Sequence, residues 1–63
     1  MSHDNSRYVI SRSTDGQYYF TLTASDGQTL MTSETFTTRE SAEVGIRAVR
    51  GSATVAKVVD AAE

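Results

Sequence analysis

The sequence predicts an α+β domain in which a three-stranded antiparallel meander is followed by one helix and a C-terminal strand (β3-α-β). Three observations lead to this prediction. Residues 7–33 alternate with period two and are rich in β-branched and aromatic side chains. The triplet Asp-Gly-Gln occurs twice in this stretch, at 15–17 and 26–28, which marks two tight turns. After Ser33 the apolar residues recur at helical spacing, and a valine-rich segment follows.

Burial decides the register of the first hairpin. A two-residue loop would place Ile10 opposite Thr21, on the polar side of the next strand. A three-residue loop at 14–16 places Ile10 opposite Phe20 instead. Because a slip of one residue turns every side chain to the other face, we expect the three-residue loop, with Gly16 in the left-handed conformation.

The same reasoning gives the second hairpin a three-residue loop at 25–27 and pairs Leu22 with Leu30. A two-residue loop would put Met31 in the place of Leu30, and the sequence leaves that alternative open. One face of the sheet then carries the larger apolar side chains, Tyr8, Ile10, Tyr18, Phe20, Leu22 and Leu30. The open face carries mostly hydroxyl groups, from Ser11, Tyr19, Thr21, Thr23 and Thr29.

The helical segment has recognisable ends and one apolar stripe. Thr37 or Thr38 can cap its start, and Thr37 with Glu40 has the spacing of a capping box. Gly51 is predicted to end the helix. The stripe consists of Ala42, Ile46, Val49 and Ala53. Gly45 lies on the same side, where the absence of a side chain would let the helix backbone approach the sheet closely.

The domain is predicted to span residues 7–60, between a disordered tail at 1–6 and a frayed end at 61–63. Residues 54–60 form the fourth strand in this prediction. With 63 residues, the chain buries only about 60% of its unfolded surface and has no cysteine for a disulfide. Association with another chain is therefore the expected means of stabilisation.

Composition argues against several functional classes. The net charge is −2, unlike the basic surface of a nucleic-acid-binding protein, so nucleic acid is an unlikely partner. No apolar run is long enough to span a membrane, and residues 1–6 do not resemble a signal peptide, so we expect a cytoplasmic protein. His3 is the single histidine and has no cysteine to accompany it, so neither a metal site nor a cofactor is predicted.

Several short segments occur in a distinctive order. They are Gly16-Gln17-Tyr18-Tyr19-Phe20, Leu22-Thr23-Ala24-Ser25-Asp26-Gly27, Ser33-Glu34, Phe36, Ser41-Ala42 and Gly45-Ile46. In this order they resemble the YegP-like family of small, mainly bacterial domains of unknown function. Asp26 stands where the family usually has Asn, and Phe36 where it usually has Tyr.

The resemblance implies a β3-α-β unit that works in pairs, either as tandem repeats or as two chains that exchange their C-terminal strands. With one unit, this chain resembles the homodimeric form. The exchanged segment, and hence the expected dimer interface, contains Ala56, Val58, Val59 and Asp60. The residues alone do not distinguish this exchange from a monomer whose own crossover returns residues 55–59 to its sheet.

We expect a non-catalytic structural or interaction module. The resemblance supplies no catalytic residues, and Asp15 and Asp26 are already explained by their turns. The basic residues Arg39, Arg47, Arg50 and Lys57 are interpreted as a solvated face. One alternative is that Tyr19, Thr21 and Thr23 on the open face bind a small polar ligand or single-stranded nucleic acid. A less favoured alternative is an enzyme whose site is completed across the dimer.

Overall fold

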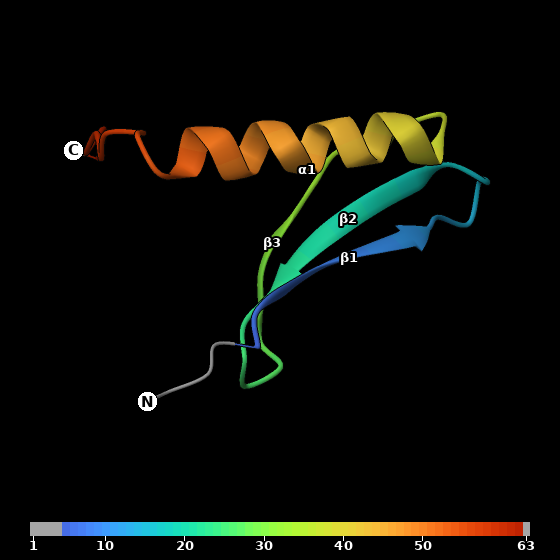
Figure 1. Ribbon diagram of the computed structural model, residues 1–63, viewed down its shortest axis with the longest axis horizontal. Coiled ribbons are helices and arrows are strands. Elements are labelled where there is room, and N and C mark those ends of the chain that lie inside the picture. Colours follow the sequence, from blue (N-terminus) through green and yellow to red (C-terminus); the bar gives the residue numbers. More distant parts are fainter. Residues whose placement is uncertain (1–4, 63) are drawn as a thin grey trace.

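The three predicted strands form one antiparallel sheet in the computed structural model, which describes residues 5–62 (Figure 1). The strands β1 (Arg7–Arg12), β2 (Tyr18–Thr23) and β3 (Thr29–Thr32) lie in the order β1-β2-β3. A single helix, α1 (Arg39–Ala53), crosses one face of the sheet and contacts β2 and β1. The α+β class and the order of strands and helix are therefore confirmed.

The first hairpin has the predicted register. Ile10 pairs with Phe20, as the burial argument required. The backbone N–H of Ser13 donates to the carbonyl of Gln17 at 2.7 Å, and the N–H of Gly16 donates to the carbonyl of Ser13 at 3.0 Å. Gly16 has φ of 85°, the left-handed conformation expected for this position.

The second hairpin has the predicted loop, but the pairing beyond it is different. The N–H of Ala24 donates to the carbonyl of Gln28 at 2.8 Å, which closes a three-residue loop. A β-bulge lies between the Thr23–Thr29 pair and the next pair, and it shifts the register. Leu22 therefore pairs with Met31. The predicted pairing of Leu22 with Leu30 is wrong, and Leu30 is 57% exposed. The bulge allows a tight turn and an inward-facing Met31 to occur together.

After β3 the chain continues alongside β2 without forming a regular strand. The N–H of Ser33 donates to the carbonyl of Phe20 at 2.8 Å, and the N–H of Phe20 donates to the Ser33 hydroxyl at 2.9 Å. Tyr18 and Phe36 exchange two backbone hydrogen bonds of 2.8 and 2.6 Å. This isolated bridge holds the start of the helix beside the first residue of β2.

Of the two candidate caps, Thr38 is the residue that caps α1. The N–H of Ser41 donates to the Thr38 hydroxyl at 3.0 Å, and the Thr38 hydroxyl donates to the Ser41 Oγ at 2.9 Å. The predicted stop at Gly51 is wrong, because the helix continues to Ala53. A glycine ends a helix by adopting positive φ, and among the described glycines only Gly16 and Gly27 do so.

The core is small and aromatic. Phe20 and Ala42 are the buried hydrophobic residues, at 1% and 0% exposure. The Phe20 ring stacks on Phe36 at 6.1 Å between centroids, and Tyr8 meets it edge-on at the same distance. A Cβ at Gly45 would lie 2.8 Å from Cζ of Phe36, so the predicted close approach of the helix is confirmed.

The C-terminal half of α1 and the segment after it extend away from the sheet (Figure 1). Residues 54–62 form no strand with their own chain, so the monomeric crossover is not the arrangement seen. The predicted fourth strand needs a second copy for its pairing and stays a prediction. Residues 1–4, including His3, and residue 63 lie outside the described part. No helix within residues 5–62 combines the length and apolar character that crossing a membrane requires.

Candidate functional site

The open face of the sheet carries the hydroxyl groups that the sequence predicted. Tyr19, Thr21 and Thr23 occupy alternate positions on β2 and are partly buried. Tyr19 lies opposite Ser11 of β1, and Thr21 lies opposite Thr32 of β3. The three residues therefore share one surface, as expected for alternate positions on a strand.

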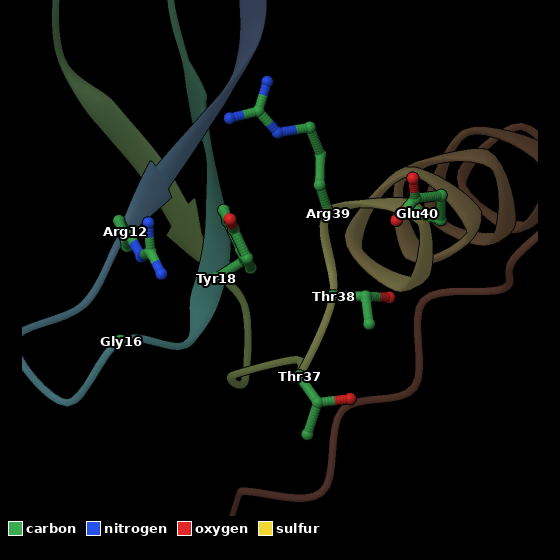
Figure 2. A pocket seen from close by; sticks show the side chains of 7 residues that line it. All are labelled: Arg12, Gly16, Tyr18, Thr37, Thr38, Arg39 and Glu40. Carbon is green, nitrogen blue, oxygen red and sulfur yellow. The ribbon is translucent and has the colours of Figure 1, made fainter.

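A hollow of about 470 Å³ lies where β2 and the helix α1 begin (Figure 2). We call it the arginine hollow. It is lined by Arg12, Gly16, Tyr18, Thr37, Thr38, Arg39 and Glu40. Arg12 is the last residue of β1, Tyr18 the first residue of β2 and Arg39 the first residue of α1.

Two guanidinium groups converge on the Tyr18 ring in this hollow. The Cζ atom of Arg12 lies 5.2 Å from the ring centroid, and that of Arg39 lies 5.6 Å from it. Both distances are within the range of a cation–π interaction. Figure 2 shows the two side chains reaching Tyr18 from different elements.

Local structure explains this convergence. Arg12 pairs with Tyr18 across the first hairpin, so the two side chains lie on the same face. Arg39 is brought to the same ring by the backbone bridge between Tyr18 and Phe36, three residues before it. Within residues 5–62, neither guanidinium forms an ion pair with a carboxylate. The hollow therefore holds two positive charges without an ion-pair partner among the described residues, and Glu40 adds one carboxylate to its lining.

The hairpin loop beside the hollow contains one perturbed carboxylate. The Ser13 hydroxyl donates to Oδ1 of Asp15, and the backbone N–H of Gln17 donates to the same oxygen at 3.4 Å. These two hydrogen bonds, the hydroxyl bond foremost, lower the pKa of Asp15 below its ordinary value of 3.8. The carboxylate is thus engaged in the turn that Gly16 completes.

A second hollow, of about 340 Å³, lies between β3 and α1. We call it the apolar groove. Its lining consists of Phe20, Met31, Ser33, Glu34, Phe36, Gly45, Ala48 and Val49. β3 is an edge strand, so no strand of residues 5–62 pairs with its outer row of backbone donors and acceptors, which runs beside this groove.

The predicted interface residues Ala56, Val58, Val59 and Asp60 lie in the exposed segment after the helix. Val58 is 99% exposed and Val59 is 81% exposed. These residues line neither hollow of the chain that carries them. Among the described residues, no group of three side chains has the composition of a metal site.

The sequence pattern does not predict the convergence of Arg12 and Arg39 on Tyr18. It places Arg39 among the basic residues of a solvated face. The first half of the pairing follows from the hairpin register, which places Arg12 opposite Tyr18. The second half depends on a long-range backbone bridge that leaves no periodic signal in the sequence.

Comparison with known proteins identifies relatives along most of the chain. The family described as "Domain of unknown function (DUF1508)" matches residues 13–60. The UPF0339 protein YegP of Escherichia coli K12 is 46% identical over 43 residues, which are 68% of this chain and 39% of that protein. A UPF0339 protein of Photorhabdus laumondii is 42% identical over 50 residues, which are 79% of this chain and 44% of that protein.

The chain thus spans about two fifths of the length of these curated relatives. No solved structure matches it significantly. The family match covers the two Asp-Gly turns, the Tyr18–Phe36 bridge and the helix, which are the features that build the fold. The chain therefore belongs to the DUF1508, or YegP-like, family of small domains of unknown function.

Proposed function

We propose that this domain is a non-catalytic association module that pairs with a second copy of itself. In this pairing, residues 56–60 of each copy lie along the outer edge of β3 in the other copy and cover its apolar groove. The observation that carries the proposal is the exposure of Val55, Val58 and Val59, at 78%, 99% and 81%. Three such valines in one short segment are costly to leave in water.

The size of the exposed surface supports the same conclusion. The chain exposes 5193 Å², against about 4,000 Å² expected for a compact monomer of its mass. Its radius of gyration is 13.6 Å, against about 10.6 Å for a compact domain of this length. The excess surface is comparable with the roughly 800 Å² that each partner buries in a standard protein interface.

The backbone of the segment is available for pairing. The last bonds of the helix end are donated by Val55 and Ala56 to the Ser52 carbonyl, at 3.1 and 2.8 Å. Between Ala56 and Asp60, the described chain forms no further backbone hydrogen bond. A segment whose backbone donors and acceptors are unpaired within the described chain suits addition to a free strand edge. In an extended strand Ala56, Val58 and Asp60 share one side, and Lys57 shares the other side with Val55 and Val59. The side with Ala56 and Val58 is therefore able to face the groove.

Substitution of Val58 by Asp tests the proposal, because the two possibilities predict opposite results. In an isolated chain Val58 is 99% exposed, so the free energy of unfolding should change by no more than about 0.5 kcal/mol. In the paired arrangement the aspartate would be buried against an apolar groove, and association together with cooperative folding should be lost.

Val44→Asp is the matched control, because Val44 is 54% exposed on the helix and lies outside both hollows and the segment. Valine and aspartate have similar helix propensities, so this variant should keep its mass and its folding. Light scattering during size-exclusion chromatography over a dilution series gives the mass, and circular dichroism gives the folding. A wild-type chain that stays at 6.8 kDa at every concentration while unfolding cooperatively would refute the proposal.

Ligand binding on the open face is the second candidate. The hydroxyl groups of Tyr19, Thr21 and Thr23 do share that face, which supports it. Fluorescence titration with short single strands at low salt tests the nucleic-acid form, since electrostatic attraction is strongest there. Absence of binding under those conditions removes it.

A further inference from the structure

We propose that the arginine hollow binds the oxyanion of a small ligand, a phosphate or carboxylate group contacted by Arg12 and Arg39. This site is separate from the association surface, and it is also separate from the open face of the sheet. Its residues come from the end of β1, the start of β2 and the first turn of α1.

The first support is the concentration of positive charge. The two guanidinium groups lie 5.2 and 5.6 Å from one ring centroid, so their separation cannot exceed the sum of those distances. At that upper bound, which is longer than the Debye length of about 8 Å at physiological ionic strength, the solvent largely screens the repulsion between the two charges. Two cations can therefore lie near one ring, and a bound oxyanion would supply the opposite charge. Among residues 5–62, no carboxylate pairs with either group.

The second support is the chemistry of the groups present. A guanidinium presents a planar fork of N–H donors that matches the two oxygens of a carboxylate or phosphate. The Tyr18 ring holds both groups in place, and its backbone is fixed by the two hydrogen bonds to Phe36. Arg12 extends from a paired strand, and Arg39 extends from the capped end of a helix. Both arginines are exposed, and they share the contact with the Tyr18 ring.

The third support is the volume of the hollow. At about 470 Å³ it is much larger than a bare ion requires, and it falls in the range of about 300–1,000 Å³ typical of small-molecule sites. Thr37 also contributes to the lining. The ligand is therefore expected to be a small organic molecule anchored by its oxyanion.

Two features oppose the binding of an anion, and they mean that binding should depend on the two arginines. The whole chain carries a net charge of −2, and Glu40 contributes a carboxylate to the lining of the hollow. General attraction between the domain and an anion is therefore unfavourable. Any binding must come from local contacts with the two arginines, so it should be lost when either one is replaced.

Titration of the ¹⁵N-labelled domain with inorganic phosphate, and separately with acetate, tests this proposal by NMR. The amide signals of Gly16, Tyr18 and Arg39 should shift in a saturable manner, and the shifts should weaken as sodium chloride is raised. The phosphate and acetate arms distinguish the two sources of the oxyanion. Arg12→Gln and Arg39→Gln should each weaken binding about tenfold or more, since hydrogen bonds to charged groups are the strong ones.

Arg47→Gln is the matched control, because it removes the same charge from an exposed position of the same helix outside the hollow. It should leave the dissociation constant within about twofold of the wild type. Arg12→Lys keeps the charge but removes the fork, and should bind more weakly than the wild type. Saturable shifts at these three amides that the two Gln variants abolish would support the proposal.

Either of two results would overturn it: no saturable shift with either anion, or equal losses in Arg47→Gln and Arg39→Gln. The mass of Arg12→Gln and Arg39→Gln should equal that of the wild type in light scattering. Failure of the anion site is therefore distinguishable from failure of the association proposal.

Discussion

Replacement of Gly45 by Ala tests how closely α1 lies against the aromatic core. An added Cβ would lie 2.8 Å from Cζ of Phe36, 3.3 Å from Cε1 of the same ring and 3.2 Å from Cε2 of Phe20. Carbon atoms normally rest about 3.5–4.0 Å apart, so at least one ring has to move. Phe36 is held by two backbone hydrogen bonds to Tyr18, and Phe20 is 1% exposed. The buried Phe20 ring has no free space to retreat into, and a shift of the partly buried Phe36 ring would disturb its stacking on Phe20.

Two terms of opposite sign set the size of the effect. Alanine gains about 1 kcal/mol of helix propensity over glycine. Overpacking of a close contact costs about 1–3 kcal/mol. We therefore expect Gly45→Ala to be less stable than the wild type by about 1 kcal/mol, because the contact term exceeds the propensity term.

Gly51→Ala is the matched comparison in the same helix. Nothing lies within 4 Å of a Cβ built at Gly51, and the helix continues past it to Ala53. Only the propensity term applies there, so this variant should be more stable by up to about 1 kcal/mol. The difference of about 2 kcal/mol between the two variants corresponds to roughly 8–16 °C in Tm for a domain of this size.

Thermal and urea unfolding, followed by circular dichroism, measure this difference. All samples should have the same protein concentration, since association would otherwise shift the midpoint. If Gly45→Ala were as stable as Gly51→Ala, the helix would not lie against the two rings, and the account of the core given above would be wrong.

Two further substitutions test the hydrogen bonds that shape the sheet. The lowered pKa of Asp15 means that its carboxylate stabilises the first turn above its ordinary pKa of 3.8, and that this contribution disappears as the pH falls through the lowered value. Asp15→Asn should therefore be less stable than the wild type near neutral pH, and the difference should vanish in acid unfolding experiments; a difference that did not depend on pH would contradict this. Ser33→Ala removes the acceptor of the Phe20 N–H and should cost about 1–2 kcal/mol in urea unfolding. The exposed Ser25→Ala should stay within about 0.5 kcal/mol of the wild type, and an equal loss in both serine variants would show that the Phe20 bond is unimportant.

Local signals in the sequence were sufficient for the fold class and for the first hairpin. Ile10 and Phe20 could be paired because their apolar side chains lie on the same face of the sheet. Gly16 indicated where the loop lies. The second hairpin shows where such reasoning reaches its limit. Assigning faces by alternate residues assumes that the two strands pair without interruption. A single bulge keeps the predicted turn at 25–27 but places Met31, and not Leu30, on the inner face.

The helix end shows a similar limit. The sequence predicts that the helix ends at Gly51, because glycine often adopts positive φ after a helix. Here Ser52 and Ala53 continue the helical bonds, and the last turn closes when Val55 and Ala56 donate to the Ser52 carbonyl. Glycine permits a left-handed residue but does not require one.

Phe36 connects the two proposed surfaces, and this decides which substitutions can test each of them. Its ring lines the apolar groove and stacks on Phe20, while its backbone bridge to Tyr18 positions the segment that leads to Arg39. A change that displaces this ring, such as Gly45→Ala, would disturb the groove and the hollow together. Val58 and Arg39 each touch only one of the two surfaces as proposed. Loss of pairing in Val58→Asp and loss of anion binding in Arg39→Gln are therefore independent results, and each proposal can fail while the other stands.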